Sequence, residues 1–203
     1  MHKKLVNLID YRLRKNKDGL PGIKGMFEVS TKDGRKLFTK DNLIVYVGRE
    51  IFAQKLFNFD RTGNGEQNLF ISWMSVGTGG ADPADPLTPV APTLTDTSLN
   101  NEIVIDATDP TTIDGGRKKK FNTLEILQDT NNDNKYLIVK ATMILERDQA
   151  NGANLNEAGL WLCNSDDVNQ ADTNTLRLAS RITFPTIVKN NQLELILAWY
   201  YFL

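Results

Sequence analysis

The 203-residue sequence has little of the chemistry on which most enzyme active sites depend. It contains one histidine, His2, and one cysteine, Cys163, so intrachain disulfides and a cysteine metal cluster are excluded. A Ser-His-Asp or Cys-His arrangement would have to use His2, and a metal site would lack its commonest ligand. Any two of the 25 acidic residues could meet in the fold, but nothing singles out a pair. We therefore expect no enzyme, with no catalytic residues, no cofactor and no bound metal.

Long hydrophobic runs and net charge are also missing. No apolar stretch approaches the about 18 residues of a membrane span. Asn7 and Asp10 interrupt the apolar residues near the start of the sequence, so we expect no secretory signal. The formal net charge of −1 gives no global electrostatic reason to bind nucleic acid or an anionic membrane. We expect no membrane partner and no specific nucleic acid.

Two local features have a plain structural interpretation beside a functional one. Cys163 ends the apolar run Gly159–Cys163, which favours a small core residue over a reactive thiol. The basic cluster Arg117-Lys118-Lys119-Lys120 is expected to be a solvated entry to a strand. The alternative is a docking patch for an acidic neighbouring subunit or for packaged DNA. No aromatic residues alternate with these lysines, so base stacking is not indicated.

Most of the chain shows the periodicity and turn chemistry of β-strands. Residues 1–25 alternate basic and apolar side chains before several glycines, which predicts an N-terminal arm outside the core. Met26–Thr31 and Lys36–Thr39 flank Asp33-Gly34, a strong hairpin signal. From Asn42 the apolar period becomes helical, which predicts one short α-helix at about residues 42–58.

The later strands are separated by turn residues and by one long loop. Residues 77–95 contain Pro83, Pro86, Pro89 and Pro92, and we expect this Pro-rich loop to lack regular structure and to be ordered by a partner. The final strand is apolar on both faces, so it must be central to a sheet or covered. The predicted strands are Leu69–Val76, Glu102–Ala107, Lys119–Gln128, Tyr136–Arg147, Leu176–Thr183 and Gln192–Leu203. The pattern predicts an all-β fold, a jelly-roll-like β-sandwich in a single domain spanning residues 26–203.

Two short motifs resemble ligand-binding loops but lack essential positions. Gly77-Thr78-Gly79-Gly80 follows a strand, yet no Lys-Ser/Thr follows its glycines and no helix can start at Asp82-Pro83. Asp129–Asn134 begins like a calcium loop, but Asn134 and Lys140 replace the required glycine and bidentate glutamate. We interpret the first as turn glycines and the second as a polar hairpin turn.

Three segments together resemble bacteriophage virion structural proteins of the tail, neck and head-appendage type. They are Asn42–Val45 with Gly48-Arg49; Val76–Gly79 with Thr95–Leu99 and Asn101–Ile103; and Asn156–Trp161 with Arg181–Phe184 and the closing strand Leu193–Phe202. The motifs consist of turns and strand ends, so no functional residue is carried over from the resemblance. The usual family form is more compact between the Gly-Thr-Gly turn and the pair Asp96-Thr97.

The resemblance implies a structural subunit of a phage virion (neck or collar, tail, baseplate, or head fibre or decoration). Such a protein would act by self-assembly into a homo-oligomer and by docking to other phage structural proteins. Its location would be the virion, assembled in the host cytoplasm. The alternative is a carbohydrate- or receptor-binding β module, which needs exposed aromatic side chains. The candidates for that role are Trp161, Trp199, Tyr200 and Tyr201.

Overall fold

The computed structural model describes residues 24–45, 47–48, 69–128 and 137–202. Most of the predicted N-terminal arm, most of the predicted helix and the calcium-like loop 129–134 lie outside these residues. The chain enters the first strand at Lys24, so Lys24 and Gly25 belong to the sheet and not to an arm.

The fold is all-β, as predicted. Ten strands form one antiparallel sheet in the order β6-β7-β3-β10-β11-β2-β1-β12-β9-β8. A separate two-stranded ribbon, β4–β5, lies within the Pro-rich loop, and a single 3-10 turn precedes β11. The strands are β1 Lys24–Thr31, β2 Lys36–Ile44, β3 Phe70–Gly77, β4 Ala81–Asp82, β5 Asp85–Pro89, β6 Thr112–Ile113, β7 Lys118–Lys120, β8 Thr123–Gln128, β9 Leu137–Leu145, β10 Asn154–Cys163, β11 Arg177–Val188 and β12 Leu195–Phe202.

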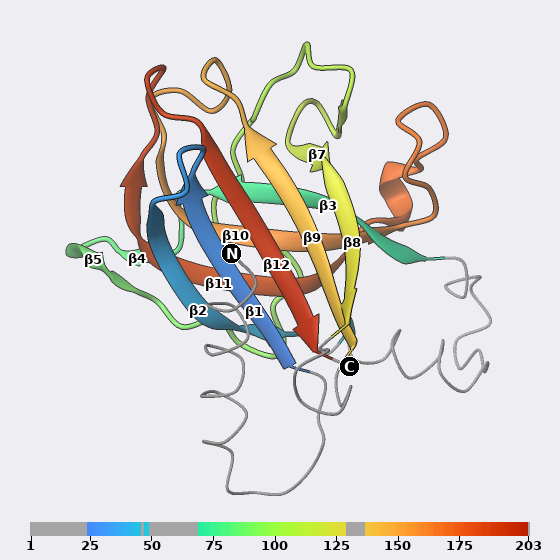
Figure 1. Cartoon of the computed structure of the whole chain (residues 1–203), viewed down its shortest axis with the longest axis horizontal. Helices are drawn as coiled ribbons and strands as arrows, with labels where there is room; N and C mark the ends of the chain where they lie inside the picture. Colours follow the sequence, from blue (N-terminus) through green and yellow to red (C-terminus); the bar gives the residue numbers. More distant parts are fainter. Residues whose placement is uncertain (1–23, 46, 49–68, 129–136, 203) are drawn as a thin grey trace, which may run out of the picture.

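The sheet curls over on itself through β2. This strand pairs with β1 along most of its length and with β11 through Leu43 and Ile44. As a result β1, β12, β9 and β8 form a layer in front of β3, β10 and β11 and cross them steeply (Figure 1). A jelly-roll-like sandwich of two separate sheets is therefore not confirmed, because one strand belongs to both layers.

The extension of β2 also corrects the start of the predicted helix. Asn42, Leu43 and Ile44 are strand residues. Ser180 donates a hydrogen bond to the Leu43 carbonyl oxygen (2.7 Å), and the Val45 N–H donates to Ala179 (3.2 Å). Pairing with β11 thus decides the conformation here, since tertiary hydrogen bonds outweigh a local helical period.

The β1–β2 hairpin confirms the Asp-Gly signal. The Gly34 N–H donates to the Thr31 carbonyl (2.9 Å), and Gly34 has φ 87°, a conformation that glycine adopts without a Cβ penalty. The hairpin places Phe27 in the main core, where its ring lies 4.3 Å from that of Trp199 and 5.6 Å from that of Phe184.

The apolar strand β12 is central, as predicted. It lies between β1 and β9. Leu197, Trp199 and Tyr201 enter the core between the layers, whereas Ala198 and Tyr200 pack in a second cluster with Met26 and Ile138. Both faces of the strand are therefore buried.

Three predicted segments differ from the structure. Glu102–Ala107 is not a strand and joins the sheet only through the bridge between Gly77 and Glu102. Lys119–Gln128 is divided into β7 and β8, which pair with β3 and β9 in different layers. The break lies at Asn122, whose side-chain oxygen accepts a hydrogen bond from the Ile144 N–H (2.7 Å). The Pro-rich loop does contain regular structure, the ribbon β4–β5.

Candidate functional site: an anchored loop

One buried carboxylate holds both ends of the loop 77–101, which contains the Pro-rich stretch. Glu157 lies in β10 and is fully buried. Its Oε1 accepts hydrogen bonds from the N–H groups of Gly79 (3.1 Å) and Asn101 (2.8 Å), and its Oε2 accepts from Asn100 (3.1 Å). Glu157 therefore joins both ends of a loop that leaves the sheet after β3, beside the backbone hydrogen bond from the Thr78 N–H to Asn101 (2.9 Å).

Arg181 of β11 completes this anchor. Its Nη2 and Nε donate to Glu157 Oε2 (2.7 and 3.2 Å), and its Nη1 donates to Asp96 Oδ2 (2.7 Å). In the sequence Arg177 and Arg181 alternate with Leu176, Leu178 and Ile182, yet the Arg181 side chain is buried. The two carboxylates compensate the positive charge of the buried guanidinium and also accept hydrogen bonds from its N–H groups.

Asp96 lies at the far end of the same loop. Partial burial alone would raise its pKa, but hydrogen bonds from Thr93 and Arg181 outweigh this and hold the pKa below its usual value. Asp96 is therefore charged at neutral pH and fixes the returning half of the loop to β11.

The glycines of the Gly77–Gly80 turn allow close approach between backbones. A Cβ on Gly80 would collide with the carbonyl of Asn156, and one on Gly79 would collide with Asn100. The Gly80 N–H donates to Asn156 Oδ1 (2.7 Å). The N–H groups that would cradle a phosphate are thus occupied by side chains of the protein itself.

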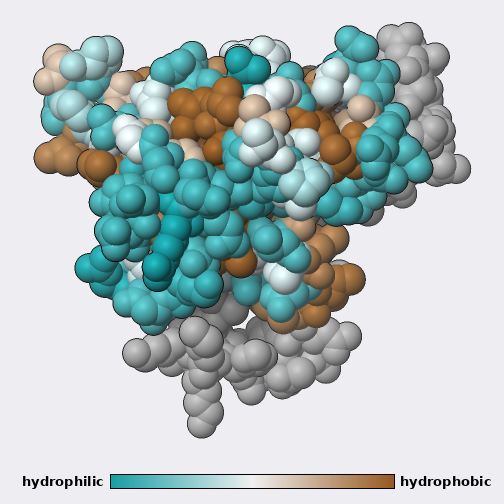
Figure 2. Space-filling view, turned by 90° about the horizontal axis from the view of Figure 1, so that it is seen from above, coloured by the Kyte–Doolittle hydropathy of each residue, from teal (hydrophilic) through white to brown (hydrophobic). Residues whose placement is uncertain are grey.

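Beyond its anchored base, the loop projects as an exposed ribbon. The Val90 N–H donates to Gly80 (2.9 Å), and Thr186 of β11 donates to the Pro86 carbonyl (2.7 Å). Leu87 is nevertheless 72% exposed, and Val90 and Leu94 are 44% and 43% exposed. Figure 2 shows apolar surface at the left-hand end of the molecule, where Figure 1 places β4 and β5. The chain itself supplies the anchors, and contact of the tip with a partner stays a prediction.

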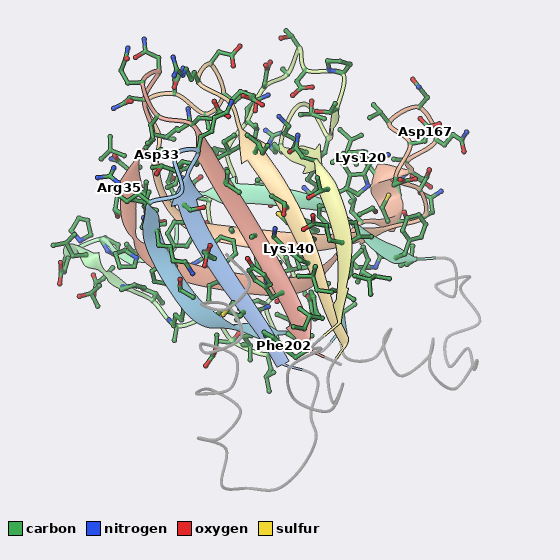
Figure 3. All side chains as sticks on the ribbon, viewed as in Figure 1. Asp33, Arg35, Lys120, Lys140, Asp167 and Phe202 are labelled. Carbon is green, nitrogen blue, oxygen red and sulfur yellow. The ribbon has the colours of Figure 1, made fainter. Side chains whose placement is uncertain are left out.

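The three lysines of the basic cluster form ion pairs with acidic residues of the same chain. Lys118 and Lys119 are buried, so a solvated strand entry is wrong for both. Lys118 pairs with Glu102 (2.8 Å) and Asp114 (2.7 Å), and Lys119 with Asp109 (3.2 Å). The exposed Lys120, labelled in Figure 3, pairs with Asp166 (2.9 Å). A docking patch for an acidic neighbour or for DNA would have to break these pairs.

The aromatic residues considered for glycan binding are all buried. Trp161, Trp199, Tyr200 and Tyr201 are each at most 6% exposed. Trp161 donates its indole N–H to Ser75 (2.7 Å), and Lys118 lies over its ring. None of the four can stack on a sugar. Cys163 is also fully buried, which confirms its core position.

An open groove of about 610 Å³ lies between residues 103–105 and 148–154. Among the described residues that line it, Asp148 is the one with an ionisable side chain. Within the described ranges, no group of three or more histidine, cysteine or acidic residues is placed to hold a metal ion. Among those residues, no helix is long and apolar enough to cross a membrane.

Comparison with protein-family models, with curated proteins and with solved structures gave no match. The candidate site therefore rests on its geometry and on the sequence resemblance. Glu157, Arg181 and Asp96 all occur in the segments that carry the resemblance, but the sequence assigned them no role. Glu157 lies close to the apolar run Gly159–Cys163, and an acid beside such a run was a signal for a buried ion pair.

Proposed function

We propose that this chain is a structural subunit of a phage virion, in the neck or collar, tail, baseplate, or head fibre or decoration. It acts by assembling with copies of itself and by docking to other virion proteins.

The observation that carries the proposal is the anchored loop. Glu157 and Arg181 fix its base, and Thr186 holds Pro86 near its tip, so the loop has a set shape before it meets a partner. Leu87, Val90 and Leu94 remain exposed on it. A preorganised apolar projection loses little conformational entropy on binding, which favours a permanent protein–protein contact. This supports a role in assembly.

At the base of this loop, the sequence segments that resemble phage virion proteins contact one another. Val76–Gly79, Thr95–Leu99 and Asn156–Trp161 are far apart in the sequence, and Glu157, Arg181 and Asp96 join them in one hydrogen-bonded network. Residues that the resemblance groups by pattern are thus also neighbours in space.

The test is the mass of the purified full chain by mass photometry and by size exclusion with light scattering. The proposal expects one discrete multimer, or a monomer that forms one when other virion proteins are added. A carbohydrate-binding module would instead remain monomeric and change its elution with glycans. A monomer that associates with neither itself nor virion proteins contradicts the proposal.

A further inference from the structure

β8 forms one edge of the ten-stranded sheet. It pairs with β9 on one side, and within the described part of the chain no strand pairs with its other side. Figure 1 shows it as the outermost strand of the front layer. Alternate residues of such a strand direct their N–H and C=O groups away from the sheet, so the natural complement is another extended backbone.

The core-side face of β8 is apolar and uncovered. Leu124 and Ile126 face Ala141 and Val139 of β9, and these β9 residues belong to or pack on the main core. Directly opposed residues share a face of the sheet, so Leu124 and Ile126 extend the core face beyond β9. They are nevertheless 61% and 69% exposed.

Edge strands in soluble proteins are normally protected against association. Proline, a charge on the core side or a bulge serves this purpose. The sequence of β8 is Thr-Leu-Glu-Ile-Leu-Gln, which contains no proline and places leucine and isoleucine on the core side. Its pairing with β9 is regular over all six residues. β8 therefore has none of these three protective features, and its edge is open to pairing with another strand.

We propose that β8 pairs antiparallel with β8 of a second copy of this chain. A second β8 supplies hydrogen-bond partners for the backbone groups on the unpaired side of this strand. It also supplies an apolar core-side face that can continue the face formed by Leu124 and Ile126. The formal net charge of −1 also lets two copies approach without strong repulsion. This interface goes beyond the proposed function, since it holds whether or not the protein belongs to a virion.

Symmetry limits the register. Facing residues must share a face of the sheet, so in a two-fold pair one residue of β8 faces its own counterpart. Centres at Glu125 and at Ile126 overlap equally over the six residues of β8, and the first is favoured because it places Leu124 opposite Ile126 of the second copy, whereas the second places Leu124 opposite Gln128. The two Glu125 side chains then face each other on the other side of the sheet. Each is already paired with Lys140 (3.0 Å), labelled in Figure 3, which offsets the repulsion.

The pairing is a modest contact. Two six-residue strands bury less than the roughly 800 Å² per partner of a stable complex. The dimer is therefore concentration-dependent in solution and is strengthened where other contacts hold copies together.

Cysteine cross-linking tests the register in the full chain. Glu125→Cys would place two thiols opposite each other, and mild oxidation then gives a disulfide-linked dimer. Leu124→Cys is the matched control, since it faces Ile126 and not itself. The native Cys163 is buried and does not interfere. No dimer from Glu125→Cys, or an equal yield from Leu124→Cys, overturns the proposal.

Sedimentation over a range of concentrations supplies the second measurement. Ile126→Lys introduces a charge at an exposed position of the edge, so the melting temperature should stay the same. We expect self-association through β8 to weaken at least tenfold. Unchanged self-association in this folded variant overturns the proposal, and neither result depends on finding the protein in particles.

Discussion

A single carboxylate, Glu157, accepts hydrogen bonds from both ends of the loop 77–101. A buried charge is costly unless hydrogen-bond donors surround it. Here three backbone N–H groups and the Arg181 guanidinium converge on its two oxygens. Removing the charge therefore weakens the bonds from three backbone N–H groups and leaves the buried Arg181 guanidinium without its paired charge.

Glu157→Gln should lower the free energy of unfolding by about 3 kcal/mol, because removing one charge of a buried ion pair leaves the other charge buried without a counterion. Urea denaturation measures the change. The matched control is Asp166→Asn, which breaks the exposed pair with Lys120 and should cost less than about 1 kcal/mol. Equal small effects in both variants would mean that the anchor does not hold the loop.

Acid should destabilise the protein through Asp96 and Asp109. Hydrogen bonds from Thr93 and Arg181 overcome the effect of burial and lower the pKa of Asp96, and those from Thr111 and Lys119 do the same for Asp109. At low pH the unfolded chain then binds more protons than the folded chain. Stability is full above the unfolded-state aspartate pKa of about 3.9 and falls as the pH drops through and below it.

Asp96→Asn isolates one part of this effect. The variant should be less stable at neutral pH, and its free energy of unfolding should depend less on pH between about pH 5 and pH 2. Denaturation curves at a series of pH values measure both. Parallel pH profiles for the variant and the native chain would exclude Asp96 as a contributor.

At the scale of elements, local patterns predicted what depends on neighbours in sequence. The β1–β2 hairpin follows from Asp33-Gly34, and the alternation of β9 and the apolar β12 gave their faces correctly. β10 is buried along nearly its whole length, so it has no alternation to detect. The extension of β2 to Ile44 depends on pairing with β11, a contact that no local period encodes.

The candidate site was harder to predict for the same physical reason. Glu157, Arg181 and Asp96 come from three distant segments, and only the fold brings them together. The sequence showed the turn glycines and the prolines of the loop but not the carboxylate that anchors them. Lys118 and Lys119 likewise formed a basic cluster in sequence, whereas their acidic partners come from the preceding loop and from Asp114.

Ending the chain at Leu197 should abolish soluble protein. The truncation removes Trp199, Tyr200 and Tyr201, all buried, and leaves β1 and β9 without the partner strand between them. Burial of each large apolar side chain is worth about 1.5–3 kcal/mol, and a typical domain has only about 5–15 kcal/mol in total. A soluble truncated chain with an unchanged melting temperature would show that β12 is dispensable.

The tip of the loop should matter for assembly and not for folding. Leu87→Ser and Val90→Ser alter exposed side chains, so each should change the free energy of unfolding by less than about 0.5 kcal/mol. The same changes should weaken association with neighbouring subunits, measured by mass photometry. Val188→Ser, at an exposed position of β11, is the control. Assembly that tolerates both tip variants would remove the loop from the interface.

At the scale of the whole molecule, an all-β sheet presents two surfaces suited to association. The anchored loop projects beside β11, and β8 leaves an apolar edge on the front layer. The three lysines of the basic cluster are paired within the chain and the net charge is close to zero, so the proposed association would depend on shape and apolar contacts. Both surfaces favour a protein that works by being incorporated into a larger assembly.

Quantitative mass spectrometry of purified particles tests the proposed role in a virion most directly. Particles from the native source would be banded by density, treated with nuclease and protease, and analysed for this chain beside their major structural proteins. We predict that the chain co-purifies at a fixed ratio to those proteins through every step. Recovery of the chain only in the soluble fraction, with none in the particles, would contradict it.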